Sequence, residues 1–180
     1  MRLSAPPSPR RPSRGLLRLA RPAIQSAIRN PQFLPMRIAV LSDTHDRLPP
    51  EILARIAGAN EIWHLGDVCS PVLIDSLEQV GPPVRVILGN CDSCPHWPER
   101  LDMEIEGVRI RLEHIPPPQP PEGFDLLLHG HTHVPRNELR GSTRFLNPGS
   151  LGRPNKGAPA SFGWLELNRG EEPRWRIERV

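Results

Sequence analysis

Short apolar runs alternate with helical patterns from residue 36 onward. Three apolar runs have the length of buried strands: residues 37–41, 61–65 and 84–88. Two segments between them carry apolar side chains at helical spacing: residues 50–58 and 71–80. Ser70 and Pro71 are expected to begin the second helix, as N-cap and first-turn residue. Strand, helix, strand, helix and strand at this spacing predict βαβ units and a parallel sheet.

The pattern after residue 100 is mostly that of β-structure. Two alternating runs on either side of Gly107 predict a hairpin over residues 101–113, and a proline-rich loop is expected to follow it. Four further short strands are predicted: residues 125–128, 144–146, 162–167 and 175–177. The chain is therefore predicted to be an α/β protein with its helices in the first half.

Residues 1–35 differ from the rest of the chain in composition. They contain seven Arg, seven Pro and no acidic residue. We favour the interpretation that they are a disordered or mis-called extension, with Met36 as an alternative start, ahead of a single domain over residues 36–180. An organelle targeting segment, which is also Arg-rich and poor in acids, is the alternative.

The charge balance changes once this segment is set aside. The whole chain has a formal net charge of +3, but residues 36–180 hold 16 basic and 20 acidic residues. This balance argues against a broad nucleic-acid-binding face. No stretch approaches the roughly 18 consecutive apolar residues of a membrane span.

Three cysteines, Cys69, Cys91 and Cys94, are an odd number and do not form the disulfide framework of a small secreted domain. A reducing, cytoplasmic location is therefore expected. Cys91 and Cys94 have the spacing of a redox pair or of half a zinc site, which is one alternative to the function developed below.

Polar side chains that bind metals follow the ends of five predicted strands. They are Asp43 and His45, then Asp67, then Asn90 and Asp92, then His114, and then His131 and His133. Loops beyond the carboxyl ends of strands in open α/β sheets converge on one crevice. Each motif alone has an ordinary interpretation as a turn, but five in this order predict one metal site.

The order D-x-H, G-D, G-N, H and G-H-x-H resembles that of the calcineurin-like metallophosphoesterases, and in particular their small single-domain phosphodiesterases from bacteria and archaea. The turn Asn147-Pro148-Gly149-Ser150 is also similar to one in that subgroup. The resemblance covers residues 36–180. It implies a four-layer αββα sandwich of two mixed β-sheets flanked by helices, and metal-dependent hydrolysis of a phosphodiester by a metal-activated water.

The resemblance implies seven ligands for two divalent ions. One ion would be held by Asp43, His45, Asp67 and His133, and the other by Asp67, Asn90, His114 and His131. Asp67 would bridge the ions and hold the nucleophilic water, and Asn90 would also orient the phosphate. Mn²⁺ is the expected metal, and Ni²⁺, Co²⁺, Fe²⁺ or Zn²⁺ suit the same ligands.

Two positions depart from the family pattern. Many members have a histidine, the apparent general acid, where this chain has Cys91. A thiol is a poor proton donor to an alkoxide, so leaving groups of low pKa should be preferred. His114 is usually followed by Gly, whereas Ile115 precedes a proline here, so the loop beside the second metal is expected to take a different path.

Three further residues near these motifs are candidates for the site. Asp92 is expected to orient a histidine ligand. Trp97 and Arg47, together with Cys91, are candidates for substrate binding, although packing of the tryptophan and solvation of the arginine are the ordinary interpretations.

The resemblance also implies the partners. A small-molecule phosphate ester is the expected substrate. A homo-oligomer is also possible by resemblance, because the small relatives often form dimers or tetramers. The alternative is a non-catalytic scaffold like the retromer subunit that shares the fold and has a degraded metal site. The complete set of predicted ligands in this chain favours catalysis.

Overall fold

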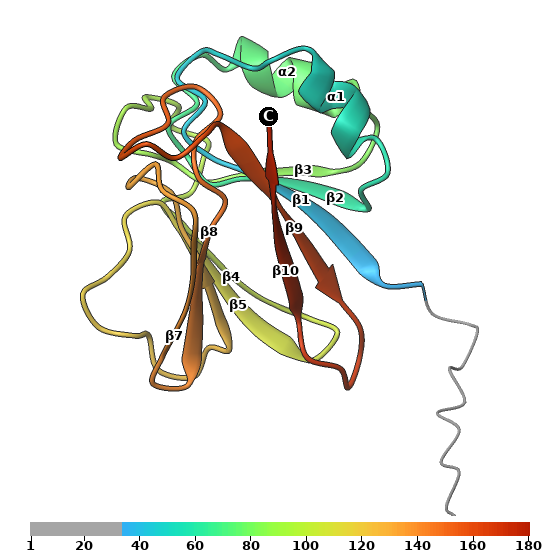
Figure 1. Cartoon of the computed structure of the whole chain (residues 1–180), viewed down its shortest axis with the longest axis vertical. Helices are drawn as coiled ribbons and strands as arrows, with labels where there is room; N and C mark the ends of the chain where they lie inside the picture. Colours follow the sequence, from blue (N-terminus) through green and yellow to red (C-terminus); the bar gives the residue numbers. More distant parts are fainter. Residues whose placement is uncertain (1–33) are drawn as a thin grey trace, which may run out of the picture. The chain divides into compact units, whose positions relative to one another are not determined.

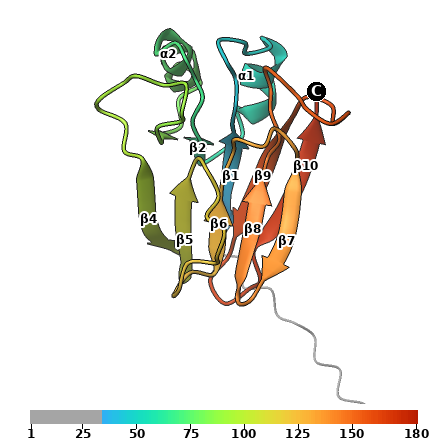
Figure 2. The same ribbon diagram turned by 90° about the vertical axis from the view of Figure 1, so that its left-hand side faces the viewer.

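The strands form two five-stranded mixed sheets. The computed structural model describes residues 34–180. The first sheet has the order β10 (Arg174–Arg179), β9 (Ser161–Leu167), β1 (Met36–Leu41), β2 (Glu61–His64) and β3 (Val84–Val86). The second has the order β4 (Arg100–Ile105), β5 (Val108–Glu113), β6 (Leu126–Leu128), β8 (Thr143–Asn147) and β7 (Arg136–Arg140). The two sheets stack against each other (Figures 1 and 2).

Each sheet contains three neighbouring parallel strands. In the first sheet, β1, β2 and β3 are parallel, as the βαβ pattern predicts, and β9 and β10 are antiparallel. In the second, β5, β6 and β8 are parallel, and β4 and β7 pair antiparallel at its two edges. Carboxyl ends of several strands therefore lie at one edge of each sheet.

Strand β1 is apolar throughout because both of its faces are buried. Ile38 and Val40 face the second sheet and belong to the core between the sheets. Ala39 and Leu41 face the other way, into a core shared with the helices. A continuous apolar run is typical of a strand covered on both sides.

Both helices of the described residues cover the first sheet. In Figure 1, α1 (Glu51–Ile56) and α2 (Val72–Glu78) lie over one face of this sheet. Helix α1 buries Ile52 and Ile56, and α2 buries Leu73 and Leu77, in the core shared with the sheet. The prediction that Ser70 caps α2 is wrong, because Pro71 occupies the N-cap position and no side chain caps the helix. No helix in residues 34–180 is long and apolar enough to span a membrane.

The predicted α/β fold of two mixed sheets with flanking helices is confirmed. No helix of the described residues covers the outer face of the second sheet. Arginine side chains and the proline-rich loop cover part of this face instead. Phe145 is fully buried there, with the guanidinium groups of Arg136 and Arg140 lying 4.8 and 5.0 Å from its ring. Arg140 also donates a hydrogen bond to the carbonyl of Pro118 in the proline-rich loop, and Thr143 donates one to Pro121. This loop therefore takes part of the place of the outer helical layer that the resemblance implies.

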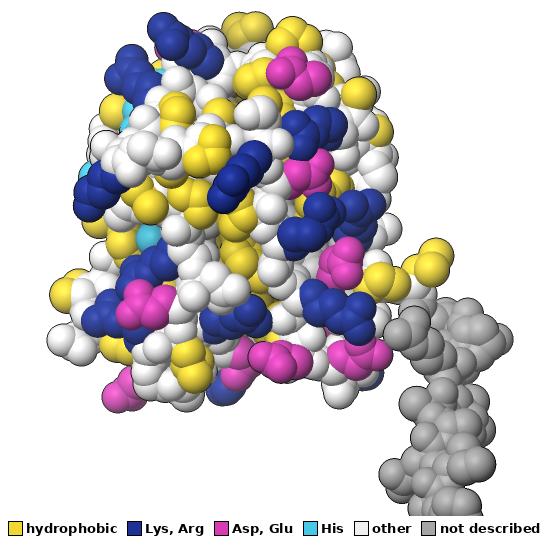
Figure 3. Space-filling model, in the orientation of Figure 1, with side chains coloured by type: hydrophobic (Ala, Val, Ile, Leu, Met, Phe, Trp, Pro, Cys, Tyr) yellow, Lys and Arg dark blue, Asp and Glu magenta, His cyan; other side chains and the backbone are white. Residues whose placement is uncertain are grey.

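The chain divides into units of residues 1–31 and 32–180, and the structure describes the second of these from residue 34. The expectation for the segment ahead of Met36 therefore falls almost entirely outside the described residues. On the face shown in Figure 3, Lys and Arg side chains are interspersed with Asp and Glu. Ion pairs among the described residues include Arg174 with Glu171 and Arg176 with Glu178.

Candidate metal centre

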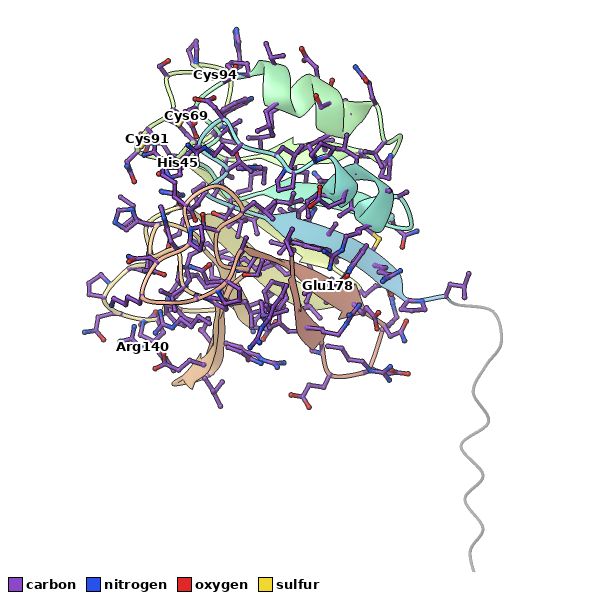
Figure 4. All side chains as sticks on the ribbon, turned by 45° about the horizontal axis from the view of Figure 1, so that its top comes forward. His45, Cys69, Cys91, Cys94, Arg140 and Glu178 are labelled. Carbon is purple, nitrogen blue, oxygen red and sulfur yellow. The ribbon has the colours of Figure 1, made fainter. Side chains whose placement is uncertain are left out.

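The predicted ligands meet where the parallel strands of the two sheets end. Three of the loops follow β1, β2 and β3 in the first sheet, and two follow β5 and β6 in the second. All seven side chains that the sequence singled out come together at this edge, and Figure 4 labels one of them, His45. The geometry of the site follows from two groups that share Asp67.

The first group contains Asp43, His45, Asp67 and His133, with one ligand atom of each within 4.8 Å of the others. Asp43 Oδ1 lies 3.2 Å from His133 Nε2. His45 Nε2 lies 3.3 Å from His133 Nε2 and 3.7 Å from Asp67 Oδ2. Two carboxylates and two imidazoles facing one point form a donor set for a divalent ion.

The second group contains the other oxygen of Asp67. Asp67 Oδ1 lies 3.4 Å from His114 Nε2, and that nitrogen lies 3.1 Å from Asn90 Oδ1. Asn90 Oδ1 lies 2.9 Å from His131 Nδ1. Asp67 therefore turns one oxygen toward each group, which is the position that a bridging carboxylate requires.

Hydrogen bonds fix the orientation of two of these rings. His114 Nδ1 donates to the carbonyl oxygen of Leu65 at 2.7 Å, and His133 Nδ1 donates to the carbonyl oxygen of Arg153. A backbone acceptor on Nδ1 leaves the lone pair on Nε2, directed into the site. The Ile115 departure does not displace His114, which is 3% exposed and remains in contact with Asp67, while Ile115 itself is exposed.

Asp92 supports the site through the backbone, so the prediction that it orients a histidine is wrong. Its carboxylate accepts hydrogen bonds from the backbone N–H groups of Asp67, Cys69 and Gly89, at 2.7–2.8 Å. These contacts join the loop after β2 to the loop after β3. Asp92 closes the turn that begins at Gly89, and no hydrogen bond among the described residues joins its carboxylate to a histidine ring.

The predicted ligands have an unusual backbone conformation. Five of the seven have φ between 43° and 66°, namely Asp43, His45, Asp67, His131 and His133. This left-handed region is disfavoured for residues other than glycine, and such strain gathers at functional sites.

The two glycines of the G-D and G-N motifs are required by close approach of the loops. A Cβ at Gly89 would lie 2.1 Å from the backbone nitrogen of Asp67, and one at Gly66 would lie 2.7 Å from the Cα of Gly89. Only glycine at both positions lets the loops after β2 and β3 come this close.

Burial and mutual contact shift the pKa values of the site. Burial, helped by the nearby Asp67 charge, raises the pKa of Asp43. Burial also opposes ionisation of Asp67, but hydrogen bonds from His114 and the Cys91 N–H outweigh it and hold that pKa well below its usual range. Two carboxylates that are at most 2% exposed need positive charge nearby, so the residues present fit divalent cations.

Sequence reasoning missed two residues beside the site. Cys69 Sγ lies 3.5 Å from His45 Nδ1. Arg153 supplies the carbonyl that orients His133, and its charge helps to lower the pKa of His45, for which burial is the main cause. No motif contains Cys69, and its closeness to Asp67 in the sequence was the only available signal.

The substrate-binding candidates take different positions. Cys91 is exposed and its backbone N–H donates to Asp67 Oδ1 at 2.8 Å, so it lies at the site. Arg47 is exposed on the loop that carries His45. Trp97 is half-buried and packs against the core beneath the helices, which agrees with the ordinary packing interpretation. Their roles in substrate binding stay predictions.

His64 is fully buried and contacts the loop that contains Thr44. Because of this burial, we expect the stability of the protein to depend on pH. His64 Nε2 lies 3.1 Å from Thr44 Oγ1, and His64 Nδ1 has no partner in residues 34–180. Burial, with a contribution from His114, lowers the pKa of His64 to about 3. The unfolded chain binds this proton near pH 6.5, so stability is constant above that pH and falls as pH decreases toward 3.

Between about pH 8 and pH 5, His64 alone is expected to remove about 2 kcal/mol from the free energy of unfolding. Denaturant unfolding at the two pH values measures this loss. In His64→Gln the loss should be smaller by that amount, whereas the exposed His96→Gln serves as the matched control. Equal pH dependence in wild type and His64→Gln would contradict the argument.

Comparison with known proteins places the chain among phosphoesterases. Residues 36–170 match the calcineurin-like phosphoesterase superfamily domain. The chain is 30% identical to phosphodiesterase YfcE of Escherichia coli, over 73% of this chain and 88% of YfcE. It is 33% identical to a probable metallophosphoesterase of Methanocaldococcus jannaschii, over 64% of this chain and 68% of that protein.

Solved structures show the same fold. YfcE aligns with a TM-score of 0.60 and 32% identity, over 72% of this chain and 88% of its own. Zinc-bound Vps29 of Entamoeba histolytica aligns with a TM-score of 0.67 and 24% identity, over 81% of this chain and 98% of its own. The likeness to Vps29 shows the fold alone.

Proposed function

This chain belongs to the calcineurin-like phosphoesterase superfamily, and we propose that it is a metal-dependent phosphodiesterase with two divalent ions bound by the seven clustered side chains. The family and its metal-dependent ester hydrolysis are the starting point. The two-ion site, the choice of a diester and the role of each residue are the proposal.

The position of Asp67 carries the proposal. Its two oxygens face the two ligand groups, 3.7 Å from His45 Nε2 on one side and 3.4 Å from His114 Nε2 on the other. A single carboxylate between two sets of imidazole and oxygen donors favours two ions over one. Bound ions would activate a water molecule and neutralise charge on the phosphoryl oxygens.

The remaining ligands then have defined tasks. Asp43 and Asp67 would supply the negative charge that two ions require, and both are nearly inaccessible to solvent. Asn90 would hold the second ion through Oδ1, which lies within 3.1 Å of both His114 Nε2 and His131 Nδ1, and its amide NH₂ group would orient the phosphate. This mixed oxygen and imidazole set suits several divalent ions, and Mn²⁺ is our proposed native metal among them because of the resemblance to the family.

The residue after Asn90 favours diesters of good leaving groups. Cys91 is exposed beside Asp67, and desolvation of its thiol together with the Asp67 charge raises the pKa of that thiol. A thiol of raised pKa transfers a proton poorly to a departing alkoxide. The proposed substrate class is therefore a phosphodiester whose leaving group departs without strong acid assistance. The relative YfcE is named a phosphodiesterase.

The decisive experiment compares bis(p-nitrophenyl) phosphate with p-nitrophenyl phosphate on metal-stripped protein. Mn²⁺, Ni²⁺, Co²⁺ or Zn²⁺ is then restored one at a time. Metal-restored cleavage that favours the diester supports the proposal and identifies the working metals. If the folded protein hydrolyses neither ester with any of these metals, the phosphodiesterase proposal is wrong and a scaffold role is favoured.

We expect Cys91→His to extend hydrolysis toward monoesters with poorer leaving groups. An imidazolium at this position can protonate the departing oxygen, an effect typically worth about 10²-fold or more. Steady-state kinetics on aryl and alkyl monoesters measure the gain, and Cys94→His is the matched control outside the ligand groups. Alkyl monoester rates that match wild type in Cys91→His would refute the leaving-group argument.

A further inference from the structure

Two thiols lie on the outer side of His45, away from the ligand groups described above. Cys69, Cys91 and His45 each place one ligand atom within 4.8 Å of the others, and Cys69 Sγ is 3.5 Å from His45 Nδ1. The Nε2 atom of the same ring points to Asp67 and His133. Figure 4 shows His45 with Cys69 and Cys91 in one region of the molecule.

The backbone holds these thiols in place. The N–H of Cys69 donates to Asp92 at 2.7 Å, and the N–H of Cys91 donates to Asp67 at 2.8 Å. Cys69 also has a left-handed backbone conformation, with φ of 71°. The two cysteines come from the loops after adjacent parallel strands, so their closeness follows from the sheet and not from the Cys91-x-x-Cys94 spacing.

We propose that Cys69, Cys91 and His45 Nδ1 form a separate binding site for a thiophilic divalent ion, such as Cd²⁺ or Zn²⁺. Metal–sulfur distances of about 2.3 Å and metal–nitrogen distances of about 2.0 Å put tetrahedral ligand atoms roughly 3.5–3.8 Å apart. The Cys69–His45 separation of 3.5 Å already matches this value. Water would fill the fourth position.

Charge and protons balance in this site. Each thiol releases one proton to solvent when it binds, and two thiolates neutralise the charge of the ion. All three cysteines are free thiols in the structure. In residues 34–180, Cys94 belongs to no group of potential ligands, so it does not complete the site.

Occupancy of this site withdraws His45 from the first ligand group. A neutral imidazole has one lone pair, so a metal on Nδ1 leaves the proton on Nε2. That proton would point at Asp67 and His133, where the first ion is proposed to bind. A thiophilic ion would therefore compete with the first ion for His45 and act as an inhibitor.

Sulfur-to-metal charge-transfer absorption on titration with Cd²⁺ tests the site without any measurement of hydrolysis. The wild-type protein should give this absorption band. In Cys69→Ser, the Cd²⁺ affinity obtained from titration of the band should be lower by at least roughly 10–100-fold. Cys91→Ser should do the same, whereas Cys94→Ser keeps the band. Absence of the band in wild type, or an unchanged band in Cys69→Ser, overturns the proposal.

Thiol counting on the wild-type protein keeps the test independent of folding in the variants. Bound Cd²⁺ should protect Cys69 and Cys91 from a thiol reagent and leave Cys94 reactive. Reaction of all three thiols at saturating Cd²⁺ would also overturn the proposal. Because neither measurement uses an ester substrate, a failure here is distinct from a failure of the phosphodiesterase proposal.

Discussion

Asp67→Ala is expected to reduce metal-dependent hydrolysis by at least about 10³-fold, at or above the upper end of the roughly 10²–10³-fold cost of removing one electrostatic group from an active site. Asp67 lies between the two ligand groups and contacts both. Its removal therefore takes a donor from each proposed ion, and it also frees the Cys91 N–H that Asp67 holds at 2.8 Å.

Diester hydrolysis and metal content by elemental analysis measure this effect together. Asp67→Asn keeps one oxygen and the shape of the side chain, so it should retain more metal than Asp67→Ala. Asp75→Ala on the exposed face of α2 is the control for loss of an aspartate away from the site. Wild-type metal content in Asp67→Ala would show that the carboxylate does not bridge two ions.

Asp92→Ala is expected to lower the free energy of unfolding by about 2–4 kcal/mol, because three backbone N–H groups lose their charged acceptor. Those donors belong to Asp67, Cys69 and Gly89, all on loops that position ligands. Metal affinity should fall roughly 10–100-fold, as is usual when a group that orients a ligand is removed.

Urea unfolding and metal titration separate the two effects. Asp92→Asn offers one acceptor oxygen in the same place, so it should recover part of the stability. If Asp92→Ala bound metal as tightly as wild type while losing stability, the carboxylate would serve the fold without positioning Asp67. Unchanged stability would contradict the importance of the three hydrogen bonds.

The ligand loops could be predicted because each follows directly on a buried strand. Asp43, Asp67, Asn90 and His131 come two to four residues after strands whose apolar runs are easily recognised, and parallel strands bring their ends to one edge. The family resemblance then supplied the grouping of the ligands. The structure brings together the side chains that this reasoning selected.

Features without apolar periodicity could not be predicted. Strand β7 has the sequence RNELR and lies at the edge of the second sheet, with most of its side chains exposed, so it carries no alternating pattern. Ser70 has the side chain of an N-cap, but α2 begins from Pro71. The backbone contacts of Asp92 and the position of Cys69 depend on the path of two loops, which sequence spacing does not specify.

The left-handed conformation of five predicted ligand residues would link binding of the proposed ions to the thermal stability of the protein. Each such residue costs roughly 1–2 kcal/mol relative to ordinary backbone, so the loops that carry them are a weak part of the metal-free fold. Ions that bind only the native arrangement offset this cost in proportion to the logarithm of their concentration. Selection for tight metal binding would then also protect the protein against unfolding, and chelation would expose its ligand loops to proteases.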